Sequence, residues 1–461
     1  MKKLSPRRRL ERNWILYDVG NSAFTLLIST IMPIYFNYLA GEGGIDATTA
    51  TAYWGYAASI VTLCVAILGP TLGTLSDFSG YKRPIFFFFA IAGVLGCAAL
   101  GIPMPWLVFL VVFILTKIFY SASLVFYDSM LVDVTTHERA DDVSSKGYAW
   151  GYIGSCIPFI ISIVIVQFTP LNIAVSMPIA LAINALWWFG FTIPLMKSYR
   201  QTHFVPRTPH AVRDNFKRLF SVFSKKSDVQ NKKGIILFLV AFFLYIDGVY
   251  TIIDMATSFG TALGFDSTNL LLALLLTQVI AFPSAIVFGK LTGKVRNDVL
   301  ILVCIVAYTG IGLFAVFMTE VWQFWTLATA VGLFQGGVQA LSRSYFAKII
   351  PADQSGCLFG ILDIFGKGAA FLGTLLVSVV TQATDSVNLG AIPIVCLFAA
   401  GIAVFVVAAR VNRPYLAKQA ADDAAAAANA PLADPAAEDS AEGEAASAED
   451  TPAADDDGVS D

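Results

Sequence analysis

The stretch GTLSDFSGYKR, residues 73–83, decides how the chain is organised. It follows an apolar run and fits a tight turn at a helix end, because Gly73 and Gly80 permit close backbone approach. Asp77 is placed to accept hydrogen bonds from a neighbouring helix N-terminus or from a basic side chain. A degenerate echo, GKLTGKVR, begins 216 residues later at Gly289, with Gly293 where the aspartate would stand. The pattern predicts a chain built from two related halves.

The composition is that of an integral membrane protein. The 461 residues are 57% hydrophobic and only 14% charged, whereas soluble proteins carry about a quarter charged residues. Of the 33 acidic residues, 13 lie beyond Lys418, so the rest of the chain has 30 basic against 20 acidic residues. The six cysteines lie in or beside apolar segments, with the spacing of neither a disulfide framework nor a metal motif. We expect no metal and no cofactor.

Twelve segments are long and apolar enough to cross the hydrocarbon core, which takes about 20 residues per helix. They are 14–39, 53–75, 84–101, 106–126, 147–168 and 173–195, then 234–259, 269–288, 299–318, 321–341, 356–380 and 391–409. We therefore predict an all-α integral membrane fold of 12 transmembrane helices in two six-helix halves, 14–195 and 234–411. A basic N-terminus (1–13), a basic linker (196–233) and a disordered acidic tail (412–461) complete the predicted domains.

The basic residues set the predicted orientation. Of the 30, 28 lie in the N-terminus, the loops after even-numbered spans or the C-terminal segment. Under the positive-inside rule both termini are cytoplasmic, and we expect a multi-pass protein of the plasma membrane. In the linker, Phe216, Leu219, Phe220 and Phe223 recur with helical spacing among basic residues. This pattern predicts an amphipathic helix that ties the halves together, with lipid sensing as the alternative.

The complete pattern G-x-L-x-D-x-x-G-x-K-R of residues 73–83 lies in the loop between the second and third of twelve predicted spans. This signature resembles that of the major facilitator superfamily, whose six-helix halves are repeats. WILYDVGNSAF at 14–24, SKGYAWGYIGS at 145–155 and GLFQGGVQALSRSYFAKIIP at 332–351 are similar to its vacuole-effluxer branch, named for members proposed to move amino acids out of vacuoles. Two positions depart from that branch. Val19-Gly20 replaces Trp-Ala, and Asp128 stands where Asn is usual. The second change adds a charge near the cytoplasmic end of span four, so the resemblance alone does not establish the substrate preference. The resemblance covers residues 14–410.

The polar residues inside spans are concentrated on four of them, where burying a charge is costly. They are Asp18 and Asn21 in span one, Lys117 and Asp128 in span four, Asp247 and Asp254 in span seven, and Gln335, Gln339 and Arg343 in span ten. The resemblance implies that these same helices line a central cavity. We therefore predict that the first eight of these residues bind substrate or protons, with Lys117, Asp18 and Asp247 as a titratable set facing the cavity.

Each of these residues also has a structural alternative. Asp18 lies close enough to one face of the membrane for its side chain to snorkel toward the interface. Lys117 and Asp247 could instead form a purely structural buried ion pair. Asn21, Gln335 and Gln339 are typical of interhelical hydrogen bonds. A cytoplasmic gate is predicted separately from the signature turn, the arginine of span ten and an i, i+4 pair in span eleven. Its residues are Gly73, Asp77, Gly80, Lys82, Arg83, Arg343, Asp363 and Lys367.

The predicted function is secondary active transport by alternating access, most simply of amino acids or similar zwitterions, coupled to protons. The expected partners are a small solute, protons and the lipid bilayer, with a monomeric chain and no nucleic acid. The three histidines lie in predicted cytoplasmic loops, and G-x-S-x-G and Walker motifs are missing, which argues against an enzyme and against direct ATP drive. Efflux of another amphiphilic or lipid-like compound, or a non-transporting sensor on the same scaffold, are the alternatives.

Overall fold

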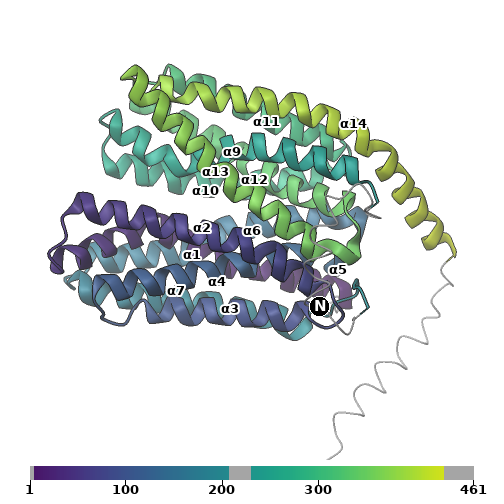
Figure 1. Ribbon diagram of the computed structural model, residues 1–461, viewed down its shortest axis with the longest axis horizontal. Helices are drawn as coiled ribbons and strands as arrows, with labels where there is room; N and C mark the ends of the chain where they lie inside the picture. The colour runs from purple at the N-terminus through teal and green to yellow at the C-terminus, as the bar shows by residue number, and fades with distance from the viewer. Residues whose placement is uncertain (1–4, 207–229, 430–461) are drawn as a thin grey trace, which may run out of the picture. The chain divides into compact units, whose positions relative to one another are not determined.

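The computed structural model describes residues 5–206 and 230–429, which are almost entirely helical (Figure 1). The helices of the first half are α1 (Pro6–Glu42), α2 (Ala47–Ser76), α3 (Lys82–Ala99), α4 (Trp106–Ser129), the short α5 (Leu131–Val134), α6 (Ala140–Phe168) and α7 (Ile173–Ser198). Those of the second half are α9 (Lys232–Ala262), α10 (Ser267–Leu291), α11 (Asn297–Val316), α12 (Val321–Ile349), α13 (Ser355–Thr384) and α14 (Ile392–Asn429).

Local sequence signals mark where several helices begin. The side chains of Ser5, Asp46 and Asn172 cap α1, α2 and α7 by accepting a hydrogen bond from the backbone three residues on. A capping box between Glu320 and Gln323 starts α12. Between these caps the helices are apolar on most faces, and large hydrophobic side chains such as Phe168 and Phe317 are more than 70% exposed. Such surfaces are suited to lipid.

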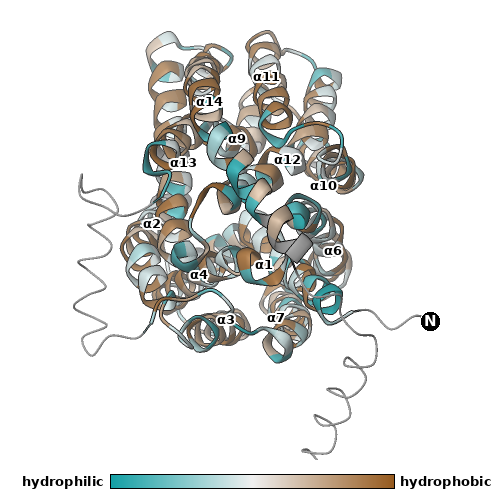
Figure 2. Cartoon of the chain, turned by 90° about the vertical axis from the view of Figure 1, so that its right-hand side faces the viewer, coloured by the Kyte–Doolittle hydropathy of each residue, from teal (hydrophilic) through white to brown (hydrophobic). Residues whose placement is uncertain are grey.

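The long helices form two groups of six, α1–α4 with α6 and α7, and α9–α14 (Figures 1 and 2). Seen end-on, α3 and α7 lie at one outer edge and α11 and α14 at the other, with the remaining helices between them (Figure 2). The same hydrogen bond recurs in both groups. Tyr17 pairs with Ser123 at 2.8 Å, and Tyr245 pairs with Ser342 at 2.7 Å, in each case joining the first and fourth long helices. The same contact thus recurs at equivalent positions of the two groups, as expected if the halves are repeats.

Within the described residues, eleven helices have the length and hydropathy to cross a membrane. The helix predicted as span ten, α12, is 29 residues long but does not reach that hydropathy. It carries Gln335, Gln339 and Arg343, and it is one of the four helices predicted to carry polar side chains into the cavity. Its polarity is compatible with a bilayer only where those side chains face protein or water.

By its internal contacts the chain divides into two compact units, Met1–Arg413 and Pro414–Asp461. The prediction of a disordered tail from residue 412 is wrong for its first part, because α14 remains helical to Asn429. Alanine, the best helix former, is the commonest residue there. The predicted linker helix around Phe216 and the acidic residues after 430 lie outside the described part of the chain.

Candidate functional site

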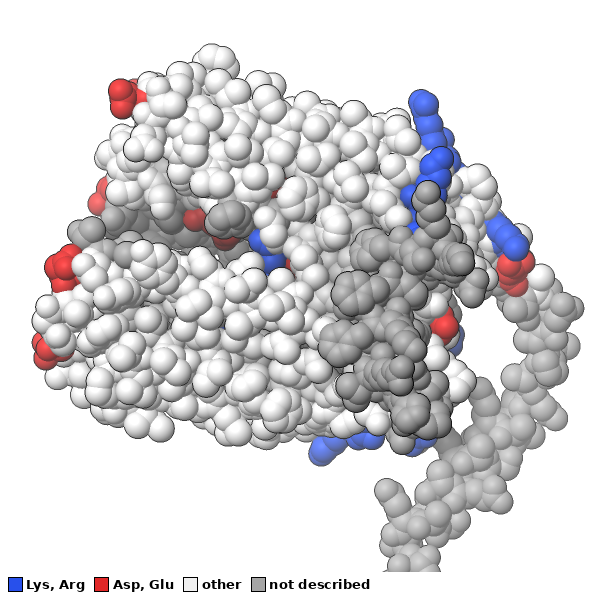
Figure 3. All heavy atoms as spheres, in the orientation of Figure 1, with Lys and Arg blue, Asp and Glu red and all other residues white. Residues whose placement is uncertain are grey.

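A cavity of about 480 Å³ lies between the two halves. It is lined by side chains of α1, α2, α4 and α6 from the first half and of α9, α12 and α13 from the second. Figure 3 shows the cleft between the halves, opening at the end away from the N-terminus, with acidic and basic side chains inside it. The four helices expected to line the cavity all do so, and α2, α6 and α13 join them.

The charged lining of this central cavity is balanced. Three cationic and three anionic side chains reach it, together with one amide: Lys117, Arg343, Lys367, Asp128, Asp254, Asp363 and Gln339. Among the described residues, Lys117 has no carboxylate within 4.0 Å, and its ammonium lies 5.5 Å from the centre of the Tyr120 ring. Asp254, on the opposite half, is exposed and likewise has no ion pair there. One free charge of each sign thus faces the cavity, one from each half.

Aromatic side chains surround these charges. Seven of them line the cavity, contributed by both halves: Trp54, Phe113, Tyr120, Tyr148, Phe242, Tyr250 and Phe359. They give the cavity a mainly apolar wall with a few polar groups, which is the usual make-up of a small-molecule site.

Four residues predicted to bind substrate or protons do not line this cavity: Asp18, Asn21, Asp247 and Gln335. Asp18 does not line it but lies beneath Arg343, and Asn21 donates a hydrogen bond to the backbone of Tyr17 on its own helix, 2.9 Å away. Asp247, predicted to face Lys117, is fully buried against α13. Its Oδ1 accepts a hydrogen bond from the Gly373 N–H at 2.8 Å, where a Cβ on the glycine would collide with the carboxylate. Asp254, two turns further along α9, takes its place in the cavity.

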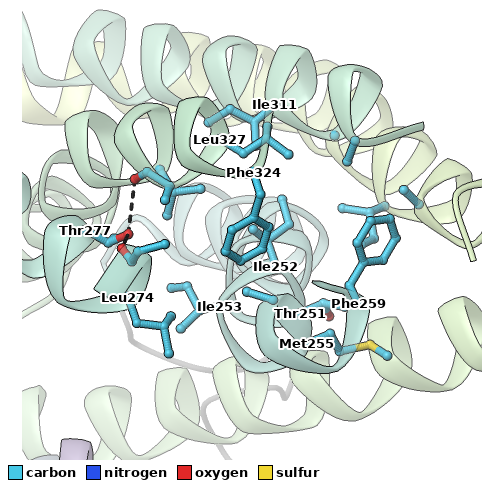
Figure 4. A pocket seen from close by; sticks show the side chains of 18 of the residues that line it. Thr251, Ile252, Ile253, Met255, Phe259, Leu274, Thr277, Ile311, Phe324 and Leu327 are labelled. Carbon is cyan, nitrogen blue, oxygen red and sulfur yellow. Dashed lines mark hydrogen bonds between the residues drawn. The ribbon is translucent and has the colours of Figure 1, made fainter. Parts of the chain in front are cut away.

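Gln335 lines a second cavity, of about 110 Å³, inside the second half. Its walls are apolar side chains such as Ile252, Phe259 and Leu327 (Figure 4), and no charged residue of the described part of the chain lines it. The Thr277 hydroxyl, also in this wall, donates to the backbone oxygen of Ala328 at 3.1 Å (Figure 4). The predicted substrate contact of Gln335 is therefore not in the central cavity, whereas that of Gln339, one turn on, is.

At the floor of the central cavity, Arg343 of α12 crosses from the second half into the first. Its guanidinium donates to Asp128 Oδ1 at 2.9 Å and lies 3.4 Å from Asp18 Oδ2. It also donates to the hydroxyl and the backbone oxygen of Ser144. The rings of Trp14, Tyr148 and Tyr127 surround it at 4.6, 4.3 and 5.6 Å. This set of contacts, the Arg343 cluster, joins the halves and closes the cavity at this end, called here the closed end.

Beside the cluster, α2 contacts α13 in what we call the α2–α13 seam. The Asp77 carboxylate accepts hydrogen bonds from the Gly356 and Cys357 N–H groups, at 2.7 and 3.0 Å. These N–H groups belong to the first turn of α13, so a side chain of one half caps a helix of the other. Lys82, fully buried, donates to the Ser355 hydroxyl at 2.9 Å and pairs with Asp133 at 3.6 Å. Gly73 lies directly against Gly356.

On the other side, α6 contacts α10 and α12 in the α6–α10–α12 seam. Gly289, the echo of Gly73, packs against Ser145. The interactions that join the halves here are made by side chains, since Asp141 lies 2.5 Å from Lys348 and accepts from Asn297 at 2.5 Å. The second copy of the signature has lost its aspartate, and an ion pair from neighbouring helices stands in its place.

Four residues predicted for the gate do not bridge the halves at the closed end. Asp363 and Lys367 form the expected i, i+4 pair at 2.5 Å, but both line the central cavity. Gly80 has a φ of +78°, which explains its glycine, and its N–H donates to Gln201. Arg83 is exposed and donates to the Met196 backbone oxygen at the end of α7. The last two residues brace the turn within the first half.

Sequence reasoning missed Asp133, Asp141 and Lys348, whose charges are all largely buried. Asp133 accepts from the Tyr199 hydroxyl at 2.6 Å and from the His203 N–H at 2.8 Å, which fixes the start of the linker. Burial raises the pKa of Tyr199 well above its usual range, so the hydroxyl remains a donor. These residues lie in loops or at helix ends, where charges are ordinary, so nothing in their local sequence set them apart.

Comparison with known proteins agrees with this geometry. Residues 7–414 match the family model described as "Vacuole effluxer Atg22 like". The chain is 41% identical to the "Uncharacterized MFS-type transporter YxiO" of Bacillus subtilis, over 86% of this chain and 93% of that protein. It is 28% identical to "Autophagy-related protein 22-1" of Aspergillus niger over 52% of this chain and 42% of that longer protein. The crystal structure of the human organic anion transporter MFSD10 superposes with a TM-score of 0.69 at 13% identity, covering 87% of this chain and all of that one.

Proposed function

The chain belongs to the Atg22-like vacuole effluxer family of MFS-type transporters, and from that premise we propose that it carries a small zwitterion, an amino acid or a close analogue, by alternating access. The observation that supports this most is the central cavity, where Lys117 and Asp254 present unpaired charges of opposite sign from opposite halves. A carboxylate and an ammonium on one solute would satisfy both. Binding would then draw the halves together around the cargo.

The proposal includes a topology of twelve spans, with α12 crossing despite its polarity and both termini on the cytoplasmic side of the plasma membrane. Under this proposal the closed end, which carries the basic ends of the helices, faces the cytoplasm, and the cavity opens outward. Under this proposal, rocking to the inward-facing state separates the Arg343 cluster and both seams. A single chain encloses the whole cavity, so a monomer suffices.

Proton coupling is proposed for Asp247. One of its carboxylate oxygens accepts from Gly373 and Thr251, while Oδ2 has no partner among the described residues. The side chains and backbone groups that contact it from α9 and α13 include no cation. A buried carboxylate without a countercharge is costly to keep ionised, so a proton is the simplest partner. Asp247→Asn is expected to leave counterflow intact and to abolish the stimulation of net transport by a pH gradient in proteoliposomes.

Counterflow in proteoliposomes tests the substrate proposal. A panel of radiolabelled amino acids should include members that exchange, and Lys117→Met and Asp254→Asn should each lower that exchange about tenfold or more, since each removes one charge-assisted contact. Arg83→Gln, which changes an exposed residue away from the cavity, is the matched control. Exchange of no amino acid, or equal exchange in all variants, would contradict the proposal.

A second candidate cargo is an amphiphilic aromatic compound. The seven aromatic side chains of the cavity wall favour it, because ring-on-ring contacts are available from both halves. The same panel separates the two candidates when it includes neutral aromatic compounds and aromatic amines. Exchange that tracks ring size and ignores charge would favour the second candidate.

A further inference from the structure

The Arg343 cluster holds one guanidinium and two carboxylates, and one of the two carboxylates lines the central cavity. One guanidinium is shared by two carboxylates, Asp18 and Asp128. The two differ in access, because the Asp128 side chain is 31% exposed and lines the cavity, whereas the Asp18 side chain is 10% exposed and does not line it. A solute in the cavity can therefore reach one of the two carboxylates that hold the arginine.

Asp128 also makes the shorter of the two contacts. Its Oδ1 lies 2.9 Å from Nη1 of Arg343, compared with 3.4 Å between Asp18 Oδ2 and Nη2. Arg343 comes from the second half, while Asp128, Asp18 and the rings of Trp14 and Tyr148 belong to the first. The contact between Asp128 and Arg343 is thus a bond across the closed end that is accessible from inside the cavity.

We propose that Asp128 binds the cationic group of the cargo and thereby weakens its bond to Arg343, so that occupation of the cavity loosens the closed end. This inference rests on the proposed function, since it gives the ammonium of a zwitterion a second role. Asp128 thus contacts the cargo directly and acts on the closed end through Arg343.

Two effects of a bound ammonium act in the same direction. It competes for the carboxylate that holds Arg343, and it places a like charge within a few ångströms of the guanidinium. The loss falls on a charge-assisted hydrogen bond, the stronger class of such bonds. Asp18 and the Ser144 oxygens still hold the arginine, so the closed end loosens without leaving a buried charge unpaired.

A tethered ammonium tests this without any cargo. Leu124 lines the cavity one helical turn before Asp128 on α4, so Leu124→Lys places an ammonium within reach of that carboxylate. The readout is alkylation of Cys357, which is 2% exposed in the α2–α13 seam, by a water-soluble maleimide in a protein whose other cysteines are replaced. Leu124→Lys should raise the alkylation rate about tenfold, the effect of weakening one charge-assisted bond.

Three comparisons make the outcome decisive. Leu124→Met, which keeps the length without the charge, should alkylate like the unmodified protein. Asp128→Asn raises the rate by itself, and adding Leu124→Lys to it should raise the rate no further. In Asp18→Asn, whose carboxylate the cavity does not reach, Leu124→Lys should still raise the rate. No increase with Leu124→Lys, or an increase that persists in the Asp128→Asn background, would overturn the inference.

Free probes extend the test to solutes. Isopentylamine should speed alkylation of Cys357 in the unmodified protein and not in Asp128→Asn, whereas 4-methylpentanoate, which carries only the carboxylate, should not. Equal effects of the two probes would also overturn the inference. Failure of the amino-acid counterflow panel would instead remove the proposed cargo and leave the tethered result standing, so the two proposals fail separately.

Discussion

The two seams of the closed end descend from one repeated pattern and are held by different chemistry. In the α2–α13 seam, glycine lies against glycine, and a carboxylate bonds to backbone N–H groups of a helix end. In the α6–α10–α12 seam, glycine lies against serine, and the bonds run between charged side chains. Backbone partners cannot rotate away and side chains can. The first seam should therefore be sensitive to small changes of shape, and the second to charge and salt.

The largest effect is expected from Gly356→Ala. A Cβ there would collide with the Gly73 backbone oxygen and the Ser76 hydroxyl, so the α2–α13 seam would have to separate. Overpacking costs about 1–3 kcal/mol, and a Cβ that meets a backbone oxygen, which cannot rotate away, falls at the upper end of that range. Alkylation of Cys357 should accelerate by about a hundredfold, the fold-change that corresponds to such a cost. In Gly289→Ala the new Cβ would lie 2.7 Å from the Ser145 Cβ, and adding Ser145→Gly should restore the original behaviour.

Asp77→Asn should come next. Asparagine keeps the shape and one acceptor oxygen but removes the charge and leaves one N–H of Gly356 or Cys357 without its bond. An unpaired buried donor and a lost charge at a helix N-terminus together cost about 2 kcal/mol. The alkylation rate of Cys357 measures the change. A result equal to that of the unmodified protein would mean that the carboxylate does not hold this seam.

In the second seam, Lys348→Gln should have a moderate effect. It leaves Asp141 with Asn297 as a donor and removes the ion pair, whose lysine side chain is 15% exposed. The expected loss is about 1.5 kcal/mol, that of one charge-assisted hydrogen bond, and it should shrink at high salt to the extent that the partly exposed lysine lets salt screen the pair. The alkylation rate of a Ser145→Cys variant measures the opening of this seam, as the alkylation rate of Cys357 does for the first seam. Salt dependence that is the same in both seams would contradict the comparison.

The smallest effect is expected from Arg83→Gln. The side chain is exposed and bonds only to the backbone oxygen of Met196 and the face of Phe87 among the described residues, all within the first half. The change should cost less than about 0.5 kcal/mol. Neither cysteine probe should react faster. A large increase in the alkylation rate of either cysteine would mean that Arg83 does hold the closed end, as the sequence predicted.

The sequence was sufficient for the helices and for half of the residues assigned to substrate or proton binding. Long apolar runs and the signature loop carry that information, and Lys117, Asp128, Asp254 and Gln339 line the cavity as their helices predicted. The position of Asp247 on its helix did not predict where its side chain lies, because the carboxylate accepts a hydrogen bond from Gly373, 126 residues further along the chain. Asp363 and Lys367 were assigned to the gate from their height in the membrane, which does not say whether a side chain faces the cavity or the seam. The partners of charges at helix ends, such as Asp141, lie far away in the sequence and could not be predicted from it.

The polarity of α12 also bears on how the protein is made. A segment with three glutamines, an arginine and a lysine partitions poorly into lipid by itself. On insertion scales an arginine costs up to about 2.5–3.5 kcal/mol, the value at the helix centre. The partners of Arg343 belong to α1, α4 and α6, which emerge from the ribosome earlier. Under the proposed topology, the first half thus acts as the template that retains this crossing. Variants of Asp18 or Asp128 should then also lower the yield of inserted protein.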